Sequence, residues 1–100
     1  MLQKMKAEIE LLTRHVLVVR AVMENQPIGI MKLSELLDLP FHRIRYSLRV
    51  LEQLGYIRAT PAGAVATPLT EAFLKNLDRD LDDLIALLES MKRENTRIKT

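Results

Sequence analysis

The sequence predicts a mainly α-helical protein that carries one short β-hairpin. Apolar residues recur at alternating spacings of three and four near both ends of the chain, which is the heptad pattern of long helices. Two shorter helical segments lie between them, followed by two strand-like segments around a Pro-Ala-Gly turn. The chain has 100 residues, 48% of them hydrophobic, and no cysteine. We therefore expect a single domain over residues 1–100, with an aliphatic core and no disulfide.

The first heptad pattern predicts one long N-terminal helix within residues 1–25. A second apolar row (Leu11, Val18, Val22) lies beside the heptad positions, so this helix can face two partners. The helix is expected to end before Pro27, because the residue preceding a proline disfavours helical geometry. The heptad positions are Leu2, Met5, Ile9, Leu12, Val16, Val19 and Met23.

Residues 28–70 are expected to form a helix-turn-helix and a hairpin. The segment MKLSELLD predicts a helix of about two turns, with its leucines Leu33, Leu36 and Leu37 facing inward. A tight turn at Asp38-Leu39 leads into a third helix over residues 40–54, with Pro40 in its first turn and Gly55 as its stop.

After this helix, residues 56–60 and 64–67 are expected to pair as strands around the turn 61–63. Thr70 is expected to cap a C-terminal helix over residues 70–98, with Glu71 in its first turn. This last helix carries the second heptad pattern, at Leu74, Leu77, Leu81, Leu84, Leu88, Met91 and Ile98.

The third helix has two contrasting faces. At about 100° per residue, Ile44, Leu48 and Leu51 share an apolar face, with Ser47 and Leu54 on its flank. The helix carries three arginines but one glutamate, whereas a solvated helix usually mixes charges of both signs. A helix fits the DNA major groove, and the planar fork of arginine can pair with guanine or with phosphate. The opposite face carries His42, Arg45, Tyr46, Arg49 and Gln53, with Arg43 on its boundary.

The segment LPFHRIRYSLRVLEQLGYI resembles the recognition-helix signature of prokaryotic, in particular archaeal, winged helix-turn-helix transcriptional regulators. Leu39, Ile44, Leu48, Leu51 and the run Gly55-Tyr56-Ile57 occupy the fixed positions of that signature. KLSELLDLP is similar to the usual second helix and turn, and PLTEAF to the exit from the wing, so the resemblance covers about residues 28–73.

The resemblance implies that His42, Arg45, Tyr46 and Arg49 face the major groove, with Tyr46 alternatively packed against the wing. It also implies that Lys32 and Ser34 approach phosphates. Phe41 departs from the pattern, because a polar residue is usual there, and Arg58 is the one basic residue of the hairpin. The full set of expected double-stranded DNA contacts is Lys32, Ser34, His42, Arg43, Arg45, Tyr46, Arg49, Gln53 and Arg58.

The two terminal helices carry more apolar surface than a small core needs, which predicts a homodimer with a coiled-coil-like interface. Residues 70–90 have six acidic and two basic side chains, and residues 91–100 have four basic and one acidic, which favours antiparallel pairing. Two recognition helices would then lie about 34 Å apart, or a multiple of that, on a palindromic site. The expected dimerisation residues are Leu2, Met5, Ile9, Leu12, Leu77, Leu81, Leu84, Leu88 and Met91.

The sequence argues against an enzyme, because it has two histidines, no cysteine and three glycines, without a metal-ligand cluster or a phosphate-binding glycine loop. We expect no catalytic residue, metal or cofactor. A signal peptide and a membrane span are also not expected, which favours the cytoplasm. Three functions stay open: a sequence-specific regulator, an architectural chromatin protein of low specificity, or a protein-interaction module. The sequence leaves open whether a small-molecule effector exists.

Overall fold

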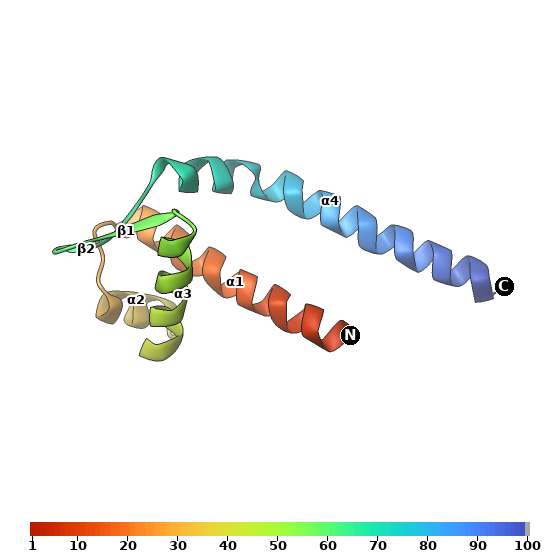
Figure 1. The fold of residues 1–100 in the computed structure, drawn as a ribbon, viewed down its shortest axis with the longest axis horizontal. Coiled ribbons are helices and arrows are strands. Elements are labelled where there is room, and N and C mark those ends of the chain that lie inside the picture. Colours follow the sequence, from red (N-terminus) through yellow and green to blue (C-terminus); the bar gives the residue numbers. More distant parts are fainter. Residues whose placement is uncertain (100) are drawn as a thin grey trace.

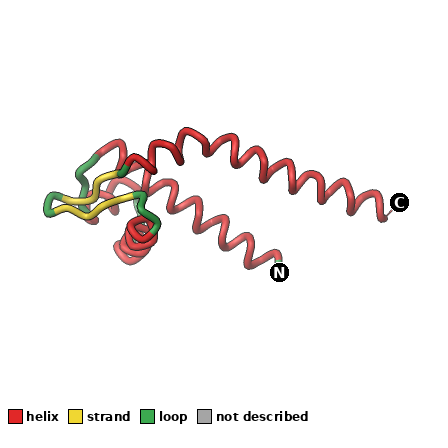
Figure 2. Tube along the Cα trace, turned by 45° about the horizontal axis from the view of Figure 1, so that its top comes forward, coloured by secondary structure: helices red, strands yellow, loops and turns green. Residues whose placement is uncertain are grey.

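The structure, a computed structural model, describes residues 1–99, with side chains through Ile98. Within these residues, four helices and a two-stranded antiparallel hairpin are present (Figure 1), so the expected mainly α class with a hairpin is confirmed. A small head contains the hairpin, the two short helices, the end of the first helix and the start of the last. Both long helices project from the head toward the same side (Figures 1 and 2). The elements are α1 (Leu2–Asn25), α2 (Ile30–Leu37), α3 (Phe41–Gln53), β1 (Ile57–Thr60), β2 (Gly63–Ala66) and α4 (Pro68–Lys99).

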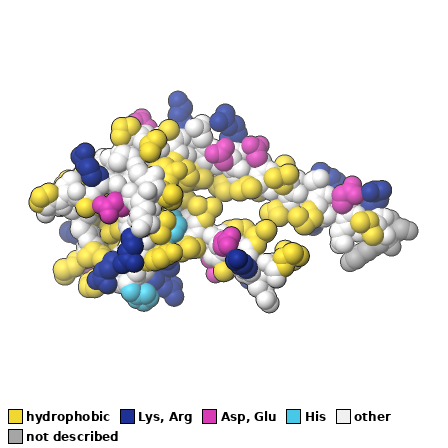
Figure 3. Space-filling model, in the orientation of Figure 1, with side chains coloured by type: hydrophobic (Ala, Val, Ile, Leu, Met, Phe, Trp, Pro, Cys, Tyr) yellow, Lys and Arg dark blue, Asp and Glu magenta, His cyan; other side chains and the backbone are white. Residues whose placement is uncertain are grey.

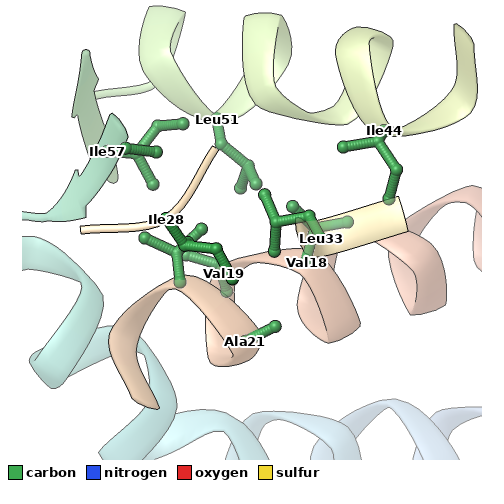
Figure 4. Packing of buried hydrophobic residues seen from close by; sticks show 10 residues of the cluster. Val18, Val19, Ala21, Ile28, Leu33, Ile44, Leu51 and Ile57 are labelled. Atoms are coloured by element: carbon green, nitrogen blue, oxygen red, sulfur yellow. The ribbon is translucent and has the colours of Figure 1, made fainter. Parts of the chain in front are cut away.

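The core of the head is aliphatic and receives side chains from α1, α2, α3 and the hairpin. Figure 4 shows these side chains converging between α3 and the end of α1. Leu36, which was expected to face inward, is instead 55% exposed. Leu33 and Leu37 lie about 40° apart on the side of α2 that faces the core, and Leu36 lies about 100° from Leu37, at the edge of that side. The buried apolar residues of this cluster are Val18, Val19, Ala21, Val22, Ile28, Leu33, Ile44, Leu51, Ile57 and Ala64.

The expected tight turn between α2 and α3 is present, and it uses a left-handed residue. Asp38 has a φ of 53°, and its backbone N–H donates to the carbonyl oxygen of Ser34. The Ser34 hydroxyl donates in turn to the carbonyl of Leu39. Pro40 lies just before α3 and not inside its first turn. Gly55, with a φ of 86°, terminates the helix as expected, because glycine adopts this conformation without a steric penalty.

The hairpin pairs Ile57 with Ala66 and Thr60 with Gly63, so Gly63 belongs to the second strand and not to the turn. Ile28, from the segment after α1, bridges the free edge of β2. Its N–H donates to the Ala64 carbonyl (3.1 Å) and its carbonyl accepts from the Ala64 N–H (2.8 Å). This short bridge fixes the hairpin against the end of α1.

The start of α4 corrects one expectation. The helix begins at Pro68, and Thr70 is its third residue and not its cap. The Thr70 side chain is fully buried, and its hydroxyl donates to the Tyr56 carbonyl at 2.5 Å. The Thr67 hydroxyl donates to the Gly55 carbonyl at 2.6 Å. The two threonines therefore bind the start of α4 to the segment between α3 and β1.

Candidate nucleic-acid interface

The outward face of α3 carries exposed basic side chains. Ile44, Ser47 and Leu51 are buried, whereas His42, Arg45, Arg49 and Gln53 are exposed. Figure 3 shows basic and histidine side chains gathered on the side of the head that holds α3. Leu54, expected on the buried flank, is 59% exposed, because α3 ends at Gln53 and the chain turns away.

The three arginines of α3 form no ion pair with the described side chains. Among residues 1–98, the ion pair found joins Arg97 to Glu94, far from the head. Glu52 lies on the same helix, yet neither Arg45 nor Arg49 pairs with it. Exposed guanidinium groups without a protein partner can bind an anion without losing an existing ion pair.

Arg45 and Arg49 line a groove between α3 and the hairpin. The groove has a volume of about 370 Å³, and its lining also includes Leu48, Glu52, Ile57 and the segment around Gly29. Arg58 is exposed on β1, where it pairs in register with Val65. The hairpin tip, Pro61 and Ala62, adds no charge. The groove therefore combines an apolar surface with two guanidinium groups and one carboxylate, all three from α3.

Tyr46 lies elsewhere than expected. Its ring packs against α1, with its centroid 6.0 Å from that of His15 and 5.8 Å from the Cζ atom of Arg14. It therefore lies neither fully on the outward face of α3 nor against the hairpin, although 44% of its surface stays exposed. A guanidinium over a tyrosine ring is attracted by the ring's negative face. Tyr46 thus helps to attach α3 to α1.

The neighbouring Ser47 completes this attachment. The Arg14 Nε donates to the Ser47 Oγ at 3.1 Å, and the same oxygen lies 2.8 Å from His15 Nδ1. Burial, followed by the positive charge of Arg14, lowers the pKa of His15 below its usual value of 6.5. A neutral imidazole can accept the single Ser47 proton, so the three groups form one hydrogen-bonded chain.

Sequence reasoning missed Arg14 and His15, which are the α1 partners of α3. A signal was present: both residues occur on the face of α1 that also carries the apolar row Leu11, Val18 and Val22. Polar residues within a buried helix face usually have a specific hydrogen-bonding partner. Here that partner is Ser47, one of the fully buried residues.

The other residues that were expected to contact DNA lie around the outward face of α3, each in a different environment. Lys32 is exposed on α2, beside Pro27 and the hairpin tip. The Ser34 hydroxyl is used within the turn by the Leu39 carbonyl. Arg43 is exposed but borders a separate groove beside α1, with Glu10 and Arg14. The structure therefore brings Arg45 and Arg49 together and places Arg43 on the other side of α3.

Comparison with known proteins does not add a relative. No protein-family model matches the chain, and no curated protein matches it significantly. Neither of the long helices, within the residues described, contains an apolar stretch that would cross a bilayer. The described side chains also include no group of three potential metal ligands close enough to hold an ion.

Proposed function

We propose that this protein is a winged helix-turn-helix transcriptional regulator that binds double-stranded DNA as a homodimer. In this proposal α3 enters the major groove and reads a specific sequence. The observation that carries the proposal is the outward face of α3, where exposed arginines lie without acidic partners on a helix whose opposite face is buried.

The dimensions of α3 suit the major groove. The helix has 13 residues and is about 20 Å long, while the groove is about 12 Å wide and admits one helix. Arg45 and Arg49 are separated by about 6 Å along the helix axis, which is close to two base-pair steps of about 3.4 Å. Both side chains can therefore reach neighbouring base edges or phosphates.

The hairpin contributes less charge than α3 in this arrangement. Arg58 is its basic residue, and the tip is uncharged. Lys32 and Arg43 flank α3 on opposite sides and can contact the phosphate backbone. Binding energy would therefore depend mainly on α3, and the affinity would fall steeply with salt.

The direct test is the double variant Arg45→Gln/Arg49→Gln, compared with Arg79→Gln, an exposed arginine of α4. A duplex is first selected from a random pool with the unmodified protein, and affinity is then measured by fluorescence anisotropy against salt concentration. If both arginines contact phosphates, the slope of log K against log salt becomes shallower by about 2. If they contact bases, each loss costs about 1–3 kcal/mol. Unchanged affinity and slope would exclude α3 as the reading helix.

The same selection separates the proposal from its alternatives. A specific regulator should prefer the selected duplex over random DNA by roughly 10³ or more at physiological salt. A much smaller preference, with similar absolute affinity, would indicate an architectural DNA-binding protein. The absence of any DNA binding would leave the basic face of α3 for an acidic protein partner.

A further inference from the structure

The projecting halves of α1 and α4 expose apolar side chains toward each other. Apart from Leu11, which is partly covered, the large apolar residues of these halves keep at least 37% of their surface exposed, the value of Leu81. A groove of about 360 Å³ lies between the two helices, lined by Ile9, Leu12, Leu77 and Leu81. Figure 3 shows hydrophobic side chains along both facing edges of this opening, which we call the trough. Leu77 itself is only 8% exposed, so it belongs to the base of the trough and not to a free dimerisation surface as expected.

The apolar faces of the two helices differ in width. On α4, the face extends from Ile85 through Leu81 and Leu88 to Leu87 and covers an arc of about 160°. On α1, the exposed face from Leu2 to Leu12 covers about 80°. A narrow stripe suits a helix at the edge of a bundle, whereas a wide arc suits a helix with several neighbours. The α1 helix of the same chain covers only the Leu81 side of the α4 arc.

We propose that the α4 helix of a second copy lies in the trough, antiparallel to the first α4. The assembly is then a four-helix bundle in which both α4 helices are central and both α1 helices are peripheral. This inference rests on the proposed function, which supplies the homodimer, and it adds which helices form the interface between the two copies. The wide arc of α4 is then divided between its own α1, the second α4 and the second α1.

The charge distribution along α4 selects the antiparallel orientation. Its acidic part (Asp78, Asp80, Asp82, Asp83) precedes its basic part (Lys92, Arg93, Arg97), so parallel copies would place like charges level with one another. An antiparallel pair with its two-fold axis between Leu87 and Leu88 places Leu84 level with Met91 of the second copy. The same register places Asp82 level with Arg93 and Asp83 level with Lys92. At this register the apolar positions face each other and the acidic part of each copy lies level with the basic part of the other, with Asp82 and Arg93 on the side of α4 away from the apolar face.

The available area also favours the participation of α1. The free part of α4, residues 78–98, is about 31 Å long and about 10 Å wide, so two copies would cover about 620 Å² between them. Specific interfaces usually exceed about 1,000 Å². The free part of α1, residues 2–12, adds about 160 Å² per copy and brings the sum to about 940 Å². These are flat projections, and the accessible area of side chains is larger.

Substitutions on α1 test the trough, because a dimer formed by α4 alone does not need them. We expect Ile9→Lys to raise the dimer dissociation constant at least about tenfold in a sedimentation-equilibrium series. Leu36→Lys is the matched control, since Leu36 is similarly exposed but lies on α2. Met5→Gln, a neutral change on the same stripe, should weaken the dimer in the same direction. Dimerisation of the α1 variants as tight as that of the unmodified chain, or an equal loss in Leu36→Lys, would overturn the trough.

Cross-linking tests the orientation independently and does not depend on the α1 variants folding. The chain has no cysteine, so single substitutions report one position each. Under the proposed register, Leu88→Cys lies beside its counterpart across a helix separation of about 8–10 Å, and a short bismaleimide should join the two copies. Asp78→Cys lies about 28 Å from its counterpart along the bundle and should not react. Equal cross-linking at both positions would indicate parallel pairing, and cross-linking at neither would exclude the interface.

DNA binding separates this inference from the proposed function. The Arg45→Gln/Arg49→Gln variant should still dimerise, because its substitutions lie on the head. Ile9→Lys should still bind the selected duplex through α3, with lower affinity because one head binds at a time. A protein that binds DNA specifically as a monomer would retain the reader role of α3 and overturn the bundle. A dimer that fails to bind DNA would support the bundle and exclude the reader role of α3.

Discussion

Substitution of Ser47 by alanine tests the attachment of α3 to α1. Ser47 and Thr70 are the fully buried polar side chains among the described residues. The Ser47 oxygen accepts from Arg14 and lies within hydrogen-bond distance of His15. Alanine removes the common partner of both α1 residues and leaves the surrounding aliphatic packing in place. The effect should therefore report the hydrogen-bonded chain and not the core.

The magnitude follows from the two lost hydrogen bonds. A neutral hydrogen bond contributes about 0.5–1.5 kcal/mol, and one to a charged group about 1.5–3 kcal/mol. Arg14 and His15 are both partly exposed, so water replaces some of the lost interaction. We expect a loss of about 1–2 kcal/mol in the free energy of unfolding. For a domain of this size, each kcal/mol lowers the melting temperature by about 4–8 °C.

Urea unfolding at pH 8, at one fixed protein concentration, measures this difference. Ser90→Ala is the matched control, because it deletes the same hydroxyl from an exposed position of α4 and should change the stability by less than about 0.5 kcal/mol. If Ser47→Ala unfolds at the same urea concentration as Ser90→Ala, the hydrogen-bonded chain does not stabilise the head.

Two further predictions concern the same head. The pKa of His15 is lowered in the folded protein, so the unfolded chain binds the proton more readily. Its contribution to stability should be complete above about pH 6.5 and should decrease as the pH falls below that value, and His15→Gln should flatten this part of a stability-pH curve. An identical curve for the variant would assign the pH dependence to other groups. Gly63→Ala should lower the melting temperature, because Gly63 has a φ of 130° and an added Cβ would lie 2.6 Å from the backbone carbon of Ile28; a melting temperature equal to that of the unmodified chain would contradict this close approach.

The helices could be predicted from the sequence because their apolar spacings are regular and their ends carry clear signals. Pro27, Asp38 and Gly55 behave as the local rules require, since a proline or a left-handed residue is decided by its own backbone. Local rules failed at Thr70, where a hydroxyl that could cap the helix is instead bound to the Tyr56 carbonyl. That bond depends on a segment 14 residues earlier in the chain. Tertiary contacts of this kind leave no periodic pattern in the sequence.

The candidate site was also predictable only where local sequence determines the position of a residue. The outward position of Arg45 and Arg49 follows from helical periodicity, and the structure agrees with it. The position of Tyr46 could not be predicted, because helical periodicity places it on the outward face and does not show which other helix lies close enough to contact its ring. Its neighbours here are Arg14 and His15, which come from a helix more than 30 residues away in the sequence. Which of two possible faces is covered depends on how the elements pack, and the pattern of one helix does not contain that information.

The proposed bundle also constrains how far apart two copies of α3 can lie. Figures 1 and 2 show α3 below the first turns of α4. The Thr70 hydroxyl in that part of α4 binds the Tyr56 carbonyl, three residues after the end of α3. With the two-fold axis beside Leu88, each α3 lies about 27 Å from the axis along α4, and the two copies lie about 54 Å apart. Successive major grooves on one face of B-DNA are about 34 Å apart. The separation along α4 exceeds one helical turn and falls short of two turns, about 68 Å, so the bundle predicts half-sites that are farther apart than one turn. The selected duplexes report this distance directly, because the centre-to-centre spacing of their half-sites depends on the length of α4 between the head and the axis.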